Sequence, residues 1–370
     1  MSVSLAFCAA DEEAELQAFL EAHWRRDHVF VHAPELLRFQ HLDAHDPGRL
    51  NFVVARDGGA DGGAMLAALG FIPLRQYGVA AGPVDVMLAI WKVRDDAPPG
   101  LGLALLKFLR GRLRPRLIGA FGLSEMVVPL YRALGYQVGT AGHHALFHPD
   151  APGEGIALRP GAPVLPPADA AGWSLRPLDL TEESDALRAL ADAQAPFKPR
   201  GYLRHRFAAH PVYRYAASGV FEGRELRAAV VWRRQPACNR SCLRIVDLWG
   251  DDAALGHVGT SLLRLLEDEG ADYLDLVEVG ADENALRAAG FLSPSLHGPV
   301  SQSRTSHGRT SQSRMARAGL VLPSYFDPFE RRNVALSYAF KAPKDTPRVR
   351  LFRGDSDQDR PNRMPRRAAA

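Results

Sequence analysis

The chain has 370 residues, of which 46% are hydrophobic, and its formal net charge is +3. At about 150 residues per domain this length predicts two domains, each able to bury a core. The small net charge argues against a nucleic-acid partner, no apolar run reaches the ~20 residues of a membrane span, and the N-terminus has no secretory pattern, so we expect a cytoplasmic protein. Three cysteines form no disulfide framework, and we expect no metal.

The N-terminal half begins with predicted strands. Residues 50–56 and 64–74 read as the two strands of a hairpin, joined by the Gly- and Asp-rich turn 57–63. A longer apolar strand follows at 85–93. A sheet therefore precedes the first informative turn.

That turn is rich in glycine and leads into a helix. Gly100 and Gly102 stand before the apolar helix 103–109. A strand, a glycine-rich turn and a helix in this order are typical of a phosphate-binding site, because backbone N–H groups and the helix dipole face the anion. A tight turn before a packed helix has the same pattern, so the glycines alone do not establish a site.

Residues 124–136, Ser-Glu-Met-Val-Val-Pro-Leu-Tyr-Arg-Ala-Leu-Gly-Tyr, are the most informative stretch of the chain. Their apolar positions recur at helical spacing, and Gly135 supplies the left-handed residue on which a helix ends before a strand at 136–138. The pattern places Tyr131 near the helix end, pointing inward.

This Leu-Tyr-x-x-x-Gly-aromatic ending resembles the GNAT superfamily of acyltransferases, and the two glycines of the turn fall on the end of that family's Gln/Arg-x-x-Gly-x-Gly motif. The resemblance implies an α/β (α+β) chain of two tandem GNAT-like acyl-CoA N-acyltransferase folds, each a mixed, mostly antiparallel sheet flanked by helices. It implies that Tyr131 protonates the departing CoA thiolate, which suits a phenol near developing negative charge. It also implies acetyl-CoA as co-substrate, bound by Val93, Arg94, Gly100, Leu101, Gly102 and Leu103.

The turn departs from the family motif. Ala97 falls on its first position, and Pro98 and Pro99 have no amide donors to offer a diphosphate. The missing positive charge would have to come from Lys92, Arg94 or Arg110.

A Pro-, Gly- and Ala-rich linker, 151–172, separates a first domain, 1–150, from a second, 173–362. The second domain repeats the order of the first, with strands at 173–178, 214–221, 224–233, 241–249 and 273–279 and helices at 182–195, 256–269 and 284–291. We expect a mobile insertion at 301–319 and a disordered tail at 363–370.

The second domain lacks the residues that carry the chemistry. Asp251 and Asp252 in its turn would repel a diphosphate, and no tyrosine precedes Ala289-Gly290-Phe291 at the expected place. We therefore interpret it as a degenerate GNAT-like domain, the alternative being an unrelated α/β domain.

Two polar segments are candidates for acceptor recognition. Residues 198–207 mix cations with aromatics, as a phosphate-bearing sugar requires, although a solvated basic helix has the same composition. Residues 354–362 hold Asp355, Asp357, Asp359 and Arg360, which suits a clamp on sugar hydroxyls, an oxygen cage for a cation, or a solvated turn. The predicted substrate-binding residues are Asp85, Trp91, Arg200, Tyr202, Asp359 and Arg360.

The C-terminal part also carries a second resemblance. Residues 323–329 and 354–362, with strands 50–55 and 90–93, are similar to GNAT-like bacterial proteins found with surface-polysaccharide and sugar-modification genes. Residues 334–340 and 349–352 alternate like edge strands.

The predicted reaction is acetyl transfer from acetyl-CoA to an amine, with an amino sugar or its nucleotide-linked form in surface-glycan biosynthesis as the acceptor. The attacking amine must be neutral, so a base has to accept its proton. The titratable candidates near Tyr131 are Asp85, Glu125, His143 and His144, and the last three join Tyr131 as predicted catalytic residues.

Two alternatives stay open. A non-catalytic binding or scaffold protein of two GNAT-like folds predicts no affinity for CoA. A relative that transfers aminoacyl groups would need a donor such as aminoacyl-tRNA, against which the modest net charge argues mildly.

Overall fold

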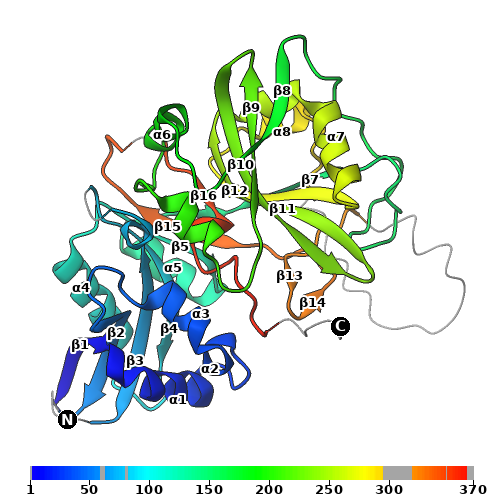
Figure 1. Cartoon of the computed structure of the whole chain (residues 1–370). Coiled ribbons are helices and arrows are strands. Elements are labelled where there is room, and N and C mark those ends of the chain that lie inside the picture. The colour runs from blue at the N-terminus through cyan, green and yellow to red at the C-terminus, as the bar shows by residue number, and fades with distance from the viewer. Residues whose placement is uncertain (1, 59–62, 80–81, 295–318, 347, 365–370) are drawn as a thin grey trace, which may run out of the picture. The chain divides into compact units, whose positions relative to one another are not determined.

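The computed structural model describes residues 2–58, 63–79, 82–294, 319–346 and 348–364 (Figure 1). Most of the predicted insertion 301–319 and of the tail 363–370 lies outside these residues. The chain forms two compact units: unit 1 comprises Met1–Gly139, Asp179–Arg214 and Leu336–Ala370, and unit 2 comprises Thr140–Leu178 and Tyr215–Ala335. The sequence predicted two contiguous domains, whereas each unit takes segments from both halves of the chain.

Unit 1 is built on a mixed sheet with the strand order β1, β2, β3, β4, β5, β15, β6. Strands β1 to β4 are antiparallel neighbours, β4 and β5 are parallel, and β15 is antiparallel to β5. The strands are β1 (Val3–Ala9), β2 (Arg49–Asp57), β3 (Met65–Pro73), β4 (Asp85–Val93), β5 (Leu117–Leu123), β6 (Gln137–Thr140) and β15 (Ser337–Lys341).

Helices cover both faces of this sheet, because successive strand residues point to opposite sides. On β2, Phe52 belongs to one apolar core and Val53 to the other. Helices α1 (Glu13–His23), α2 (Val29–His32) and α3 (Pro34–His41) contribute to the core of Phe52, and α4 (Leu101–Leu113) and α5 (Val128–Ala133) to the core of Val53.

Unit 2 repeats the arrangement, as predicted. Its strands run β8, β9, β10, β11, β12 and β7 across the sheet, antiparallel from β8 to β11, parallel between β11 and β12, and antiparallel again between β12 and β7. The elements are β7 (Gly142–Phe147), β8 (Trp173–Leu178), β9 (Ala216–Glu222), β10 (Glu225–Ala237), β11 (Arg240–Gly250), β12 (Tyr273–Val279), the 3-10 helix η5 (Asp252–His257), α7 (Gly259–Asp268) and α8 (Glu283–Ala288).

Two strands are exchanged relative to their order in the chain. Strand β7 directly follows β6, yet it pairs with β12 in unit 2, where His144 lies opposite Leu276. Strand β15 comes from the end of the chain and pairs with β5 in unit 1, where Ala339 lies opposite Ala120. Since β15 is flanked by β5 and β6, it is an inner strand and not the predicted edge strand. Its apolar alternation fits either position.

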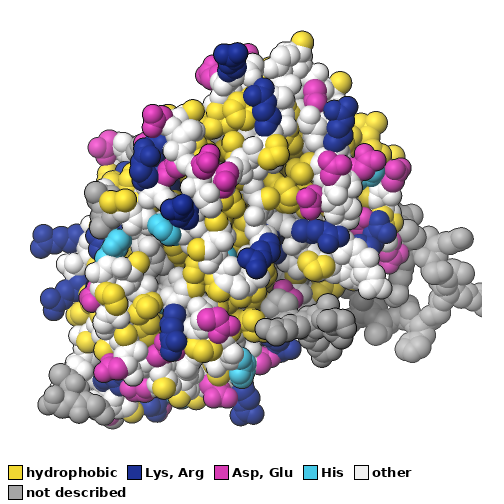
Figure 2. All heavy atoms as spheres, in the orientation of Figure 1, with side chains coloured by type: hydrophobic (Ala, Val, Ile, Leu, Met, Phe, Trp, Pro, Cys, Tyr) yellow, Lys and Arg dark blue, Asp and Glu magenta, His cyan; other side chains and the backbone are white. Residues whose placement is uncertain are grey.

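Shorter elements complete the described chain: α6 (Asp185–Asp192), η4 (Arg204–Ala208), β13 (Tyr325–Phe326), β14 (Phe329–Glu330), β16 (Leu351–Phe352) and η6 (Arg353–Asp355). None of the described helices combines the length and the hydropathy that a membrane span needs. On the face shown in Figure 2, basic and acidic side chains are interspersed, in keeping with the small net charge.

Candidate functional site

The candidate site of unit 1 lies where β4 and β5 separate. Their parallel pairing runs from Asp85 opposite Leu117 to Leu88 opposite Ala120, and both strands continue beyond it. On the other side, β4 uses the three steps from Leu88 to Trp91 against two steps of β3, which is a β-bulge. A bulge bends its strand, and the carboxyl end of β4, which stays paired with β3 from Trp91 to Val93, no longer pairs with β5.

Helix α4 begins at this end of β4. Gly100 precedes it with a φ of 83°, and no side chain caps the helix. A Cβ at Gly100 would meet no atom within 4 Å. The first amide groups of α4 are therefore available to an anion, as the glycine-rich turn predicted.

The turn itself offers little more to a diphosphate. Arg94 donates to Asp96 (Nε to Oδ1, 2.9 Å) and Lys92 donates to Asp95 (Nζ to Oδ1, 3.0 Å). Two of the three cations that could replace the missing motif residue are thus paired with carboxylates of the turn, and Arg110 lies in the last turn of α4. The amides at the start of α4 can bind an anion, whereas the carboxylates of Asp95 and Asp96 in the turn repel it.

Tyr131 lies on α5 and is 1% exposed. The predicted helical segment forms a 3-10 turn, Glu125–Val127, followed by α5, in which Pro129 has no amide to donate and fits the first turn of the helix. Gly135 has the predicted positive φ, 74°. Burial raises the pKa of Tyr131, with a further contribution from Tyr136, so its hydroxyl stays protonated and able to donate.

Trp91 lies between α4 and α5. Its ring centroid is 6.0 Å from that of Tyr131, with the planes at 76°. A Cβ added to Gly102 would come within 3.1 Å of the indole Nε1. The predicted substrate-binding residue Trp91 and the predicted cofactor residue Gly102 are therefore direct neighbours.

Asp85, predicted to bind substrate, is fully buried at the start of β4. Arg116 forms a bidentate ion pair with it, and the amides of Leu117 (3.1 Å) and Phe197 (2.7 Å) donate to its oxygens. It lies six residues before Trp91, or about 20 Å along a strand. Asp85 is an anchor of the fold, with its acceptor sites already used.

The other predicted bases have different surroundings. His143 and His144 lie on β7 in unit 2, not in the sheet that precedes Tyr131. His143 Nε2 is 3.0 Å from Asp275 Oδ2, and His144 Nε2 is 3.1 Å from Glu278 Oε1. Their sequence position after β6 suggested otherwise, because the strand exchange is invisible in a local pattern.

Glu125 lies in unit 1, two residues after the end of β5. It is exposed, and its carboxylate has no hydrogen-bond partner within the described part of the chain.

The two segments predicted to recognise an acceptor contact one another inside unit 1. Lys198 is fully buried and its Nζ lies 3.1 Å from Asp355 Oδ1. Tyr202 and Arg206 both donate to the carbonyl of Gly354, at 3.3 and 3.0 Å. The alternative of a solvated basic helix is therefore wrong.

The other predicted binding residues of these segments are buried or form ion pairs. Asp359 is 1% exposed, Arg360 donates to Asp357 (2.9 Å), and Arg200 lies on the surface, 3.7 Å from Asp185. Residues 354–360 lie beside the carboxyl end of β5, because a Cβ at Gly122, near that end, would come within 2.6 Å of the Gln358 amide carbon. Residues 354–360 thus pack as interior structure beside β5.

Two buried histidines in unit 1 were not found from the sequence. His28 Nδ1 accepts from the amide of Phe30 (3.3 Å), and His41 Nδ1 lies 3.2 Å from the carbonyl of Phe71. Burial lowers the pKa of His28 to about 2 and that of His41 to about 3, so both are neutral in the folded protein. The unfolded chain protonates both histidines near pH 6.5. Below that pH, protonation therefore favours the unfolded chain, and the free energy of unfolding falls as the pH falls.

In unit 2 the linker fills the position that an anion would take. The Asp169 carboxylate accepts from the amide (3.0 Å) and hydroxyl (2.6 Å) of Ser261, in the first turn of α7. A Cβ at Gly259 would lie 2.2 Å from the carbonyl oxygen of Pro167. The start of α7 is thus occupied by residues of the linker, which is in keeping with the interpretation of a degenerate domain. The reason differs from the expected one, which was repulsion of a diphosphate by Asp251 and Asp252.

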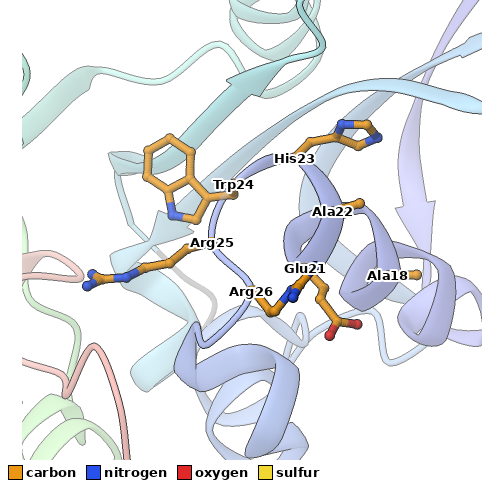
Figure 3. Close-up of a pocket in the computed structure, with 7 residues that line it drawn as sticks. All are labelled: Ala18, Glu21, Ala22, His23, Trp24, Arg25 and Arg26. Carbon is orange, nitrogen blue, oxygen red and sulfur yellow. The ribbon is translucent and has the colours of Figure 1, made fainter.

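A hollow of about 630 Å³ lies at the C-terminal end of α1 (Figure 3). Trp24 on its rim is 46% exposed. The lining residues are Ala18, Glu21, Ala22, His23, Trp24, Arg25 and Arg26.

No protein-family model and no curated protein sequence matches the chain. Among solved structures, it is similar to a GCN5-related N-acetyltransferase from Anabaena variabilis ATCC 29413, at 13% identity and a TM-score of 0.52 over 79% of this chain and 70% of that one. A GCN5-related N-acetyltransferase from Kribbella flavida has 14% identity and a TM-score of 0.45, over 76% and 65%. A tandem GNAT protein from the clavulanic acid biosynthesis pathway has 13% identity and a TM-score of 0.43, over 93% and 100%.

The similarity to the Anabaena protein shows that the chain has the fold of the GCN5-related N-acetyltransferases. The two sheets show this fold built twice in one chain, so the expected tandem α+β architecture is confirmed.

Proposed function

We propose that unit 1 is an N-acetyltransferase that moves the acetyl group of acetyl-CoA to an amine. The observation that carries this proposal is the separation of β4 and β5 between the uncapped start of α4 and the buried hydroxyl of Tyr131. One end of this gap suits the phosphates of CoA, and the other end suits a developing thiolate.

In the proposed reaction the neutral amine attacks the thioester carbonyl, a C–N bond forms and the C–S bond breaks. Tyr131 donates its proton to the sulfur, and its raised pKa keeps that proton in place until the thiolate forms. We assign the role of base to Glu125, because its carboxylate is exposed at the end of β5 and makes no bond to a described residue.

We propose an amino sugar or its nucleotide-linked form as the acceptor class. The hollow at the end of α1 supports this choice, since an exposed indole offers a stacking face, and the Glu21 carboxylate can accept hydrogen bonds from sugar hydroxyl groups. Unit 2 has its helix end filled by Asp169, and we assign it no acetyl transfer.

The test is calorimetric titration with acetyl-CoA, followed by release of free CoA thiol with a panel of amines. Micromolar binding that is lost when Gly100 and Gly102 carry bulky side chains would support the site. Turnover with amino sugars that falls in Trp24→Ala, while acetyl-CoA binding is kept, would support the acceptor class. Turnover confined to amines other than sugars would contradict that class alone.

A scaffold protein is the second candidate, and the turn before α4 favours it. Asp95 and Asp96 present carboxylates there, and Pro98 and Pro99 have no amide to donate. It predicts no binding at millimolar acetyl-CoA.

A further inference from the structure

A ligand that uses both ends of the gap in unit 1 has to cross the position of Trp91. If the phosphates lie at the start of α4 and the thioester lies at Tyr131, the arm that joins them runs from Gly102 to Tyr131. The Trp91 indole contacts both residues, at 3.1 Å from a Cβ built on Gly102 and at 6.0 Å between the ring centroids.

The sequence around Trp91 favours this blocked arrangement. The bulge in β4 ends at Trp91, which sets its side chain on the same face as α4 and α5. Gly102 has no side chain, so the indole packs directly against the first turn of the helix. The space that a glycine leaves for close approach of a ligand is thus filled by a side chain of the same unit.

We propose that Trp91 is the residue that controls entry of acyl-CoA into unit 1, and that the pantetheine arm binds in the place of the indole. Trp91 belongs to the path of the donor, and not to the acceptor site for which the sequence suggested it. This inference rests on the proposed function. It adds that the half-buried indole of Trp91 must be displaced before the donor binds, and that this displacement weakens donor binding.

The experiment compares the acetyl-CoA affinity of the wild type, Trp91→Ala and Trp173→Ala by calorimetry, with unfolding curves to verify that each variant folds. Trp173 is the matched control, because it is a half-buried tryptophan on β8 of unit 2, outside the gap. We expect Trp91→Ala to bind about tenfold more tightly or better, since the indole no longer has to give up its apolar contacts. Trp173→Ala should bind like the wild type.

A second measurement does not depend on truncation. Saturating acetyl-CoA should change the fluorescence of the wild type, and Trp91→Phe should lose most of that change although four other tryptophans remain, because the chain has 5.

The outcomes separate the two proposals. Binding by Trp91→Ala that is equal to or weaker than that of a binding wild type overturns the role of Trp91 and leaves acetyl transfer standing. Binding by Trp91→Ala alone supports the role and identifies a self-blocked donor site. Absence of binding in every folded variant overturns both.

Discussion

Replacing Tyr131 with Phe separates catalysis from stability in unit 1. General-acid catalysis contributes about 10²–10⁴ in rate, so the loss of the hydroxyl should raise the barrier by about 3–5 kcal/mol. The ring keeps its contacts with Trp91 and Tyr136, and the hydroxyl bonds to no described residue, so the free energy of unfolding should change by less than about 1 kcal/mol. Thiol release measures the first quantity, and urea unfolding measures the second.

Tyr136→Phe is the matched control. Its ring lies 5.0 Å from that of Tyr131, and its hydroxyl is buried without a partner among the described residues. Removal of an unsatisfied hydroxyl should leave turnover within about twofold and keep or raise stability. Equal losses of turnover in both variants, or wild-type turnover in Tyr131→Phe, would refute the role of Tyr131 as the acid.

Three further results concern stability. Between pH 7 and 5, His28 and His41 should reduce the free energy of unfolding by about 4 kcal/mol, since only the unfolded chain protonates them. His28→Asn keeps a capping acceptor and should remove about half of this loss in urea titrations, and an unchanged pH dependence would contradict the assignment. Asp169→Ala should cost about 1–2 kcal/mol in thermal unfolding through the lost cap of α7, and Asp169→Asn much less; equal losses would argue against a cap. Lys198→Met should lower the free energy of unfolding by about 3 kcal/mol, because the buried Asp355 loses its ammonium partner. The double variant Lys198→Met with Asp355→Leu should recover stability, and failure to do so would exclude this explanation.

Some of the site was predictable because its signals are local. Strand β4 has the predicted bounds, and α4 begins within two residues of the predicted position after Gly100. Tyr131 lies on a helix that ends before Gly135, as predicted. Periodicity and the conformational preferences of glycine act over a few residues, so the sequence alone determines them.

The function of charged residues was harder to predict, because composition does not say whether a charge faces water or a partner. Lys198 and Asp355 are 157 positions apart, so no local pattern shows that they form an ion pair. Their mutual burial depends on how the two segments pack. The same holds for Asp85, whose partners Arg116 and Phe197 come from separate segments.

The sequence by itself determined the bounds of β4, the tandem repeat and the helix that carries Tyr131. Only the tertiary structure decided that β7 and β15 exchange places, that His143 pairs with Asp275 in unit 2, and that Trp91 fills the gap beside Tyr131. A strand's own pattern records which of its faces is apolar but not which neighbour it pairs with, and that choice is made by the total burial of the folded chain.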